Sequence, residues 1–160
     1  MPEKVGNVNP PRGVRRLLWR APIWFYRLGL GGLFGKRMLL LHHTGRSSGL
    51  PRENVLEVVD YEEAANTFYV ASGFGKKSDW YRNIIKQPQV SITLGRKEIP
   101  VTAVPLSAEE SGRTLLEYAR HHPTAAKNLM SICGYKVDGS DEDYFVMGRD
   151  IVPFIALRPR

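Results

Sequence analysis

The chain has 160 residues, of which 42% are hydrophobic and 24% charged, a composition typical of a globular domain and not of a disordered or low-complexity protein. Its formal net charge of +7 favours anionic partners, and its single cysteine excludes an intrachain disulfide and favours a reducing compartment. No uninterrupted apolar run has the length of a signal peptide or a spanning helix, so we expect a cytoplasmic protein.

Residues 1–13 are polar and rich in proline, which predicts a flexible tail, and residues 14–160 are expected to form one domain. From Val14 to Leu28 apolar residues recur at steps of three and four with arginines between them, which predicts an amphipathic helix over 14–28. Pro22 should kink this helix, and the closely spaced glycines of residues 29–35 should end it.

Runs rich in β-branched and aromatic residues predict strands at 37–43, 54–61 and 67–72, and two alternating runs that meet at Gly95-Arg96 predict a hairpin. Helices are predicted over 78–88, capped by Ser78 or Asp79, over 107–122, where Ser107 and Glu110 fit a capping box, and from Pro123 to Met130.

The acidic segment 138–144 is interpreted as a solvated loop, and residues 150–159 as a last strand, in which Pro153 suggests an edge position or a bulge. The strands form antiparallel hairpins without regular alternation of strand and helix. The sequence therefore predicts a mainly β (α+β) domain: a twisted antiparallel barrel or half-barrel with peripheral helices.

The segment TGRSSGLPREN, residues 44–54, interrupts two apolar runs with glycines, hydroxyl groups and two arginines. Loop amides, hydroxyls and guanidinium groups together can bind an oxyanion, so this pattern favours a phosphate site, with a solvated hairpin turn as the alternative. A second loop, ASGFGKKSDWYRN, residues 71–83, leads from a strand into a helix and again gathers glycines, lysines and two aromatic residues.

These two segments in this order resemble the deazaflavin (coenzyme F-420)-dependent nitroreductase and quinone reductase family, a branch of the split β-barrel flavin and deazaflavin oxidoreductases. The resemblance implies a split antiparallel β-barrel of the FMN-binding type. It also implies an enzyme that transfers a hydride from the reduced coenzyme to a quinone, a nitro compound or another activated small-molecule acceptor.

The resemblance implies three groups of cofactor-binding residues. The phosphate and tail of the coenzyme are assigned to Thr44, Gly45, Arg46, Ser48, Gly49, Pro51 and Arg52, and its ring to Asn54, Val55, Leu56, Ala71, Ser72 and Gly73. The second loop and its helix contribute Lys76, Lys77, Trp80, Tyr81 and Asn83. Ser72 is also the candidate catalytic residue, as a hydrogen-bond donor to the ring carbonyls, where negative charge gathers in the reduced form.

Two positions depart from the family pattern, since Ser47 stands where many relatives have a cation and Glu57 where close relatives have an aromatic residue. An FMN-binding split-barrel oxidoreductase and a non-catalytic cofactor-binding or lipid-binding protein of the same fold therefore stay as alternatives. A nucleic-acid partner is not expected, because the basic residues are spread along the chain. The assembly is expected to be a monomer or a homodimer.

The predicted N-terminal helix has two interpretations: peripheral contact with the inner face of the cell membrane, or a cover for the barrel's open side or a dimer contact. The remaining reactive side chains are interpreted as structural. The adjacent pairs His42-His43 and His121-His122 do not have metal-ligand spacing, and Cys133 fits a small buried hydrophobic residue. No metal is expected.

Overall fold

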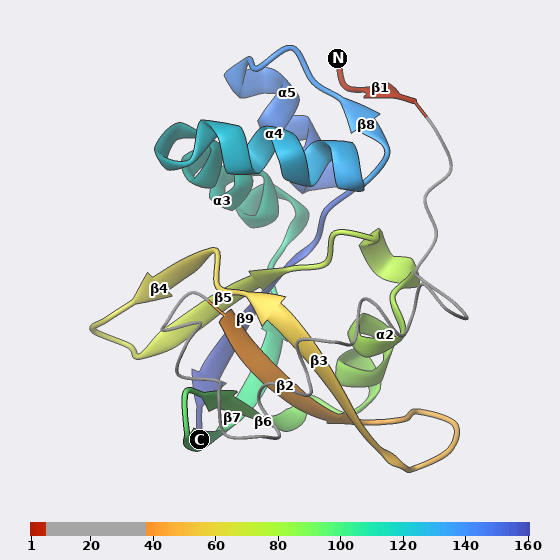
Figure 1. The fold of residues 1–160 in the computed structure, drawn as a ribbon, viewed down its shortest axis with the longest axis vertical. Helices are drawn as coiled ribbons and strands as arrows, with labels where there is room; N and C mark the ends of the chain where they lie inside the picture. The colour runs from red at the N-terminus through yellow and green to blue at the C-terminus, as the bar shows by residue number, and fades with distance from the viewer. Residues whose placement is uncertain (6–37) are drawn as a thin grey trace. The chain divides into compact units, whose positions relative to one another are not determined.

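A computed structural model describes residues 1–5 and 38–160 of the chain (Figure 1). The amphipathic helix predicted over 14–28 lies outside the described residues. The described residues form two compact units, and each is described by itself. Residues 38–70, 79–104 and 156–160 form the sheet unit, and residues 1–5, 71–78 and 105–155 form the helical unit.

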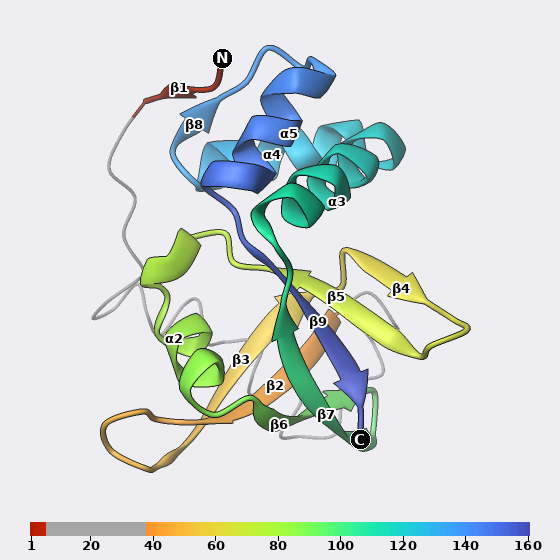
Figure 2. The same ribbon diagram turned by 180° about the vertical axis from the view of Figure 1, so that it is seen from behind.

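A seven-stranded sheet provides the framework of the sheet unit, with strand order β3-β2-β6-β7-β9-β5-β4 (Figures 1 and 2). Its strands are β2 Met38–Thr44, β3 Pro51–Glu57, β4 Asp60–Glu62, β5 Thr67–Ala71, β6 Gln89–Leu94, β7 Lys97–Pro105 and β9 Phe154–Pro159. The predicted hairpin at Gly95-Arg96 is confirmed as β6-β7, which turns between the paired residues Leu94 and Lys97. The single strand predicted over 54–61 is wrong, because β3 ends at Glu57 and β4, which pairs with β5, begins at Asp60, so the two lie at opposite edges of the sheet.

The register of β2 against β3 fixes which side chains share a face of the sheet. Met38 pairs with Glu57 and Thr44 with Pro51, so seven consecutive pairs form without a bulge. Because side chains alternate along a strand, Leu39, Leu41 and His43 lie on one face. Leu39 and Leu41 are fully buried, so this face belongs to the core. His43 on the same face is a buried polar residue.

Strand β9 lies inside the sheet, between β7 and β5, so the prediction of an edge position at Pro153 is wrong. Pro153 comes directly before the first residue of the strand. A proline at this place removes no ladder hydrogen bond from the strand itself, and the four residues that follow, Phe154 to Leu157, are fully buried.

Helix α2, Asp79–Lys86, belongs to the sheet unit and lies close to β2. Trp80, Tyr81, Asn83 and Ile84 are its buried residues, which places them on one side of the helix at steps of one, three and four. The predicted helix over 78–88 is therefore confirmed, and it presents Asn83 toward the strands.

The helical unit is built from α3 Ala108–His121, α4 Pro123–Ile132 and α5 Asp141–Asp150, which lie together in both ribbon views (Figures 1 and 2). The capping box predicted for Ser107 and Glu110 is confirmed, because each side chain accepts a hydrogen bond from the other residue's backbone N–H. Helices α3 and α5 cross closely at two glycines, since a Cβ on Gly148 would lie 2.8 Å from the Cα of Gly112.

The interpretation of residues 138–144 as a solvated loop is wrong for its second half. Ser140 caps α5 by accepting a hydrogen bond from the backbone N–H of Asp143, and the next three residues are the acidic first turn of the helix. Asp143 is buried and accepts a hydrogen bond from the backbone N–H of Asp138. A carboxylate-rich first turn complements the positive end of the helix dipole, a local signal that the interpretation missed.

A two-stranded ladder completes the helical unit, in which β1 Glu3–Lys4 pairs with β8 Tyr135–Lys136. These first residues were predicted to belong to a flexible tail, but they are paired, because extended backbone can add to a free strand edge whatever its side chains are. A short 3₁₀ turn, η2 Gly75–Lys77, also belongs to this unit.

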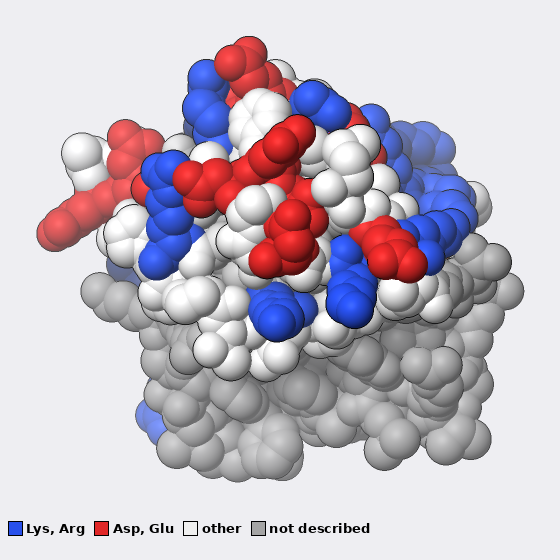
Figure 3. Space-filling model, turned by 90° about the horizontal axis from the view of Figure 1, so that it is seen from above, with Lys and Arg blue, Asp and Glu red and all other residues white. Residues whose placement is uncertain are grey.

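The helices of this unit present charges of both signs. Arg113 pairs with Glu109, and Arg120 bridges Glu117 and Asp141. Figure 3 shows acidic and basic side chains side by side on the face seen from above. Such exposed pairs contribute little stability.

Candidate functional site

The connection between β2 and β3, residues 44–52, forms a compact turn that we call the elbow. The backbone N–H of Gly45 donates to Leu50 O at 2.9 Å, and that of Gly49 donates to Gly45 O at 2.9 Å. Gly49 has φ of 69°, a left-handed conformation that glycine adopts without strain. A Cβ on Gly45 would meet Ser48 Oγ, a side chain that can rotate aside, so Gly49 is the glycine that the backbone of the turn requires.

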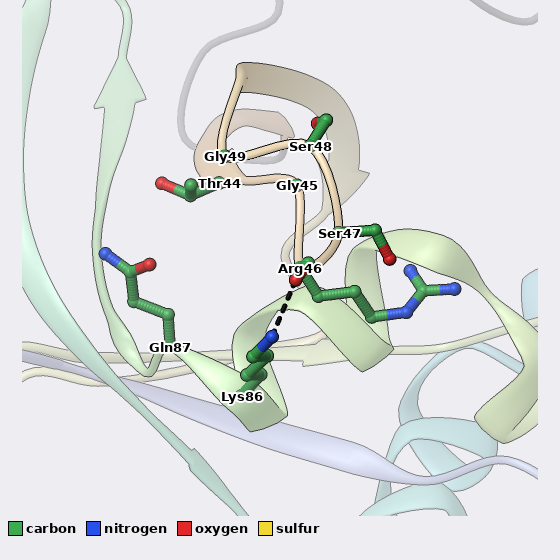
Figure 4. A pocket seen from close by; sticks show the side chains of 8 residues that line it. All are labelled: Thr44, Gly45, Arg46, Ser47, Ser48, Gly49, Lys86 and Gln87. Atoms are coloured by element: carbon green, nitrogen blue, oxygen red, sulfur yellow. Dashed lines mark hydrogen bonds between the residues drawn. The ribbon is translucent and has the colours of Figure 1, made fainter.

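A cavity of about 430 Å³ opens against the elbow (Figure 4). Six consecutive elbow residues line it, and the end of α2 supplies the remaining wall. The lining residues are Thr44, Gly45, Arg46, Ser47, Ser48, Gly49, Lys86 and Gln87. The size lies in the range of small-ligand sites, so the elbow that the sequence singled out borders a space able to hold a charged group.

The donors at this cavity suit an oxyanion. The backbone N–H groups of Ser47 and Ser48 have no partner in the part of the chain that the structure describes. Lys86 Nζ donates to Arg46 O at 2.6 Å, which occupies one of its three N–H groups and leaves its charge without a carboxylate partner among the described residues (Figure 4). Two backbone amides, three hydroxyl-bearing residues and one ammonium group therefore line one space.

Arg46 does not point into the cavity, although it lines it with its backbone. Its side chain runs along α2, away from Thr44 and Gln87 (Figure 4). Its guanidinium group donates to Asn83 Oδ1 at 3.0 Å and pairs with Asp79 Oδ1 at 3.1 Å. Because the Arg46 guanidinium is bound to Asp79 and Asn83, Lys86 is the cation that lines the cavity without a carboxylate partner among the described residues.

Asn83 connects the elbow to the core. It is buried, and its Oδ1 accepts from the backbone N–H of Arg46 at 3.0 Å as well as from the Arg46 guanidinium. Its Nδ2 lies 3.1 Å from His43 Nδ1. Trp80 and Tyr81 are also buried, with ring centroids 6.2 Å apart, and burial raises the pKa of Tyr81. The two aromatic rings thus anchor α2 and hold Asn83 in place.

The residues assigned to the ring do not share one face of β3. Asn54 and Leu56 pair with Leu41 and Leu39, so they lie on the face that carries His43, whereas Val55 pairs with Leu40 and lies on the opposite face. Asn54 Oδ1 is 2.8 Å from His43 Nε2, so its side chain is engaged within the sheet.

Arg52 pairs with His43 across the same strands, and Pro51 pairs with Thr44. The guanidinium Nε of Arg52 lies 3.6 Å from the place where a Gly45 Cβ would stand, so Arg52 supports the elbow from β3. It is not among the residues that line the cavity.

Ala71, Ser72, Gly73, Lys76 and Lys77 belong to the helical unit. Ser72 is fully buried, and its hydroxyl donates to Gly75 O and lies 3.2 Å from Ser78 Oγ. Since a hydroxyl has one hydrogen, this bond commits the Ser72 proton to the loop. The role of Ser72 as a donor to a coenzyme ring stays a prediction. Lys76 and Lys77 are exposed.

Sequence reasoning missed Lys86 and Gln87 as cavity residues and His43 as a partner of the elbow. A signal existed for Lys86, because it follows Asn83 by three residues on a helix and so lies on the same side of it. No local signal pointed from Asn83 to His43, which are 40 residues apart. Within residues 1–5 and 38–160, no group of three metal-ligating side chains comes together.

Two further interpretations concern single features. Cys133 is a buried thiol as predicted, and burial raises its pKa to about 12. Among the described helices none is long and apolar enough to cross a bilayer. The membrane contact predicted for residues 14–28 concerns residues outside the described part, and it stays a prediction together with the cytoplasmic location.

Comparison with known proteins now assigns the chain. A family model described as F420H(2)-dependent quinone reductase matches residues 20–130, which is more than half of the sequence. The chain belongs to this family. Among curated relatives, Rv3178 of Mycobacterium tuberculosis, named as a candidate F420H(2)-dependent quinone reductase, is 35% identical over 89 residues, which cover 54% of this chain and 73% of the relative. The F420H(2)-dependent quinone reductase Rv1261c of the same species is 31% identical over 98 residues, or 58% and 62%.

Solved structures confirm the fold of this family member. A structure described as an F420-H2 dependent reductase superposes with a TM-score of 0.52 at 23% identity, covering 78% of this chain and 96% of that one. A structure described as a domain-swapped dimer gives a TM-score of 0.52 at 20% identity, covering 86% and 100%. At these identities the likeness shows the fold alone, and it confirms the split β-barrel class.

The cavity fits part of the coenzyme that the family's name implies. Two amides without a partner among the described residues, hydroxyls and an ammonium group suit the phosphate and acidic tail of F-420, because N–H groups and cations bind anions. Ser47 stands where many relatives have a cation. In this family member Lys86 supplies a positive charge to the same cavity.

Proposed function

We propose that the elbow binds the phosphate and tail of reduced coenzyme F-420, and that the chain is an oxidoreductase acting on a quinone-like small-molecule acceptor. The observation that carries this proposal is the cavity lined by residues 44–49 and Lys86, where the N–H groups of Ser47 and Ser48 have no partner among the described residues. Family membership supports the same coenzyme.

When bound, the deazaflavin supplies the hydride, so the chain needs to supply binding, orientation and electrostatics. The elbow would fix one end of the coenzyme through its charged tail. Leu56 on β3 is proposed to border its ring, and the roles of Ala71, Ser72 and Gly73 toward the ring stay predictions. Contacts between the elbow and the coenzyme tail, which does not react, can restrict the orientation of the reactive ring.

FMN is the second candidate, since its phosphate could use the same donors. The relative described as a domain-swapped dimer supports a homodimer as one possible assembly of this chain, next to the monomer. The acceptor proposed here is a quinone, because that substrate class is in the names of the curated relatives.

Titration of the purified protein with F-420 and with FMN, followed by ring fluorescence, tests the proposal. We expect F-420 to bind and Lys86→Gln to weaken its affinity by about tenfold, the effect of one charged hydrogen bond. Lys97→Gln is the matched control, because Lys97 is exposed at the start of β7 and does not line the cavity.

The affinity for F-420 should fall with rising salt concentration in the wild type. It should fall less steeply in Lys86→Gln, because this variant lacks the lysine charge that salt screens. Reduction of menadione by reduced F-420 then measures turnover. Equal F-420 affinities of Lys86→Gln and wild type would show that the coenzyme tail binds elsewhere. Tight binding of FMN without binding of F-420 would show that FMN is the coenzyme.

A further inference from the structure

A chain of hydrogen bonds runs through the sheet unit from the elbow to β3. Arg46 N and Arg46 Nη1 both donate to Asn83 Oδ1 at 3.0 Å, Asn83 Nδ2 is 3.1 Å from His43 Nδ1, and His43 Nε2 is 2.8 Å from Asn54 Oδ1. Asn83 and His43 are 4% and 6% exposed, so water cannot substitute freely for either. The four residues belong to the elbow, α2, β2 and β3.

The donors in this chain determine the orientation of each group. An amide N–H and a guanidinium can only donate, so the Asn83 atom that faces Arg46 must be the oxygen. The NH₂ of Asn83 then faces His43 Nδ1, which must accept and therefore carries no hydrogen. The hydrogen of a neutral His43 ring is consequently on Nε2, where it is donated to Asn54 Oδ1.

We propose that His43 and Asn83 are positioning residues of the elbow. Neutral His43, with its hydrogen on Nε2, holds the Asn83 amide so that Oδ1 faces Arg46, and Asn83 in turn fixes the Arg46 N–H within the elbow. The next two residues, Ser47 and Ser48, line the cavity, and their N–H groups have no partner among the described residues. The role of these two residues in coenzyme binding rests on the proposed function, whereas the geometry of the hydrogen bonds does not.

Asn54, Asn83 and His43 therefore have roles that differ from those predicted from the sequence. Asn54 and Asn83 act within the protein, through His43 and Arg46, instead of contacting the coenzyme. His43 is more than a packed core histidine, because replacing it leaves the buried NH₂ of Asn83 without its acceptor. A buried NH₂ without an acceptor costs free energy, so the position of Asn83 against the Arg46 donors is held less firmly.

Nitrogen NMR of the wild-type protein labelled at histidine tests the geometry without any ligand. We expect His43 Nδ1 to give the signal of a bare ring nitrogen and Nε2 that of a protonated one. Hydrogen exchange at the Arg46 amide should be slow. A hydrogen on Nδ1, or an Arg46 amide that exchanges as fast as that of Ser47, would overturn the proposal.

Substitutions then connect the chain of hydrogen bonds to binding, with F-420 and inorganic phosphate as probes. His43→Leu should speed exchange at the Arg46 amide and weaken F-420 affinity by about tenfold, since it removes one buried polar partner. His43→Asn should restore much of the amide protection and of the F-420 affinity, because the Oδ1 of the new asparagine lies near the position of His43 Nδ1. His42→Leu is the matched control: it removes the bond to Thr93 from the other face of β2 and should change neither readout.

Asn83 provides a second pair of variants, which decides the question if His43→Leu does not fold. Asn83→Asp keeps an acceptor for Arg46, so the Arg46 amide should stay protected while His43 gains a second ring hydrogen to pair with the carboxylate. Asn83→Leu should expose the amide. Protection in both variants would overturn the proposal. If wild type binds neither F-420 nor phosphate, the proposed function fails, and exchange and NMR still decide the positioning role.

Discussion

Asn83 Oδ1 accepts two hydrogen bonds from Arg46, one from the backbone N–H and one from the guanidinium group, each at 3.0 Å. One buried amide on α2 thus fixes both the main chain and the side chain of the elbow's only arginine before Pro51. Arg46 braces the elbow against the helix, and the positive charge at the cavity is that of Lys86.

The bracing role predicts that charge alone is not enough at position 46. Arg46→Lys keeps the charge, but a lysine cannot reach Asn83 and Asp79 together with a planar fork, so we expect F-420 affinity to fall by about three- to tenfold. Arg96→Lys, in the exposed turn between β6 and β7, is the control and should not change the affinity. Fluorescence titration measures both. Wild-type affinity in Arg46→Lys would show that the fork is dispensable.

Gly49 gives a prediction about the shape of the elbow. Its φ of 69° costs an alanine about 1–2 kcal/mol, while nothing lies within 4 Å of an added Cβ, so the penalty comes from the backbone. Asparagine tolerates the left-handed conformation better. We therefore expect Gly49→Asn to keep more F-420 affinity and a higher melting temperature than Gly49→Ala. The reverse order would contradict a left-handed turn.

The crossing of α3 and α5 predicts a site where a single methyl group destabilises the helical unit. A Cβ on Gly148 would lie 2.8 Å from the Cα of Gly112, and backbone atoms cannot move aside as a flexible side chain can. Gly148→Ala should therefore lower the free energy of unfolding by about 3 kcal/mol or more. Gly73→Ala, whose Cβ would make ordinary contacts at 3.6 and 3.7 Å, is the control in urea unfolding.

Cys133 predicts how stability depends on alkaline pH. Burial raises the pKa of its thiol from 9.0 to about 12, so the folded state keeps a proton that the unfolded state releases. The contribution is complete below pH 9 and is lost as pH rises toward 12, with a slope of at most about 1.4 kcal/mol per pH unit.

Urea unfolding of wild type and Cys133→Ala at pH 8 and pH 10 measures this effect, because other titrations cancel in the difference between the two proteins. The stability advantage of the wild type should shrink at pH 10. Alkylation of Cys133 at pH 8 should be slow until the protein unfolds. A constant difference in unfolding free energy would indicate a thiol that reaches water in the folded state.

The sequence alone determined the local elements and the family. Alternating runs predicted the hairpin β6-β7, Ser107 and Glu110 predicted the start of α3, and the two loops in order predicted the family that the match over residues 20–130 confirms. These features depend on neighbours within a few residues, so they can be read along the chain. Helix α5 was missed although its cap at Ser140 was present, because its apolar residues run consecutively and show no clear period.

Only the tertiary structure decided what the polar residues of the site do. Strand β9 lies inside the sheet and Val55 lies on the face opposite Asn54, and both facts follow from pairings between distant segments. The sequence assigned Arg46 to an anion, but Asp79 and Asn83, more than 30 residues away, take its guanidinium, and Lys86 comes to the cavity instead. Hydrogen-bond partners are chosen by distance in space, and spacing along a chain does not contain that distance.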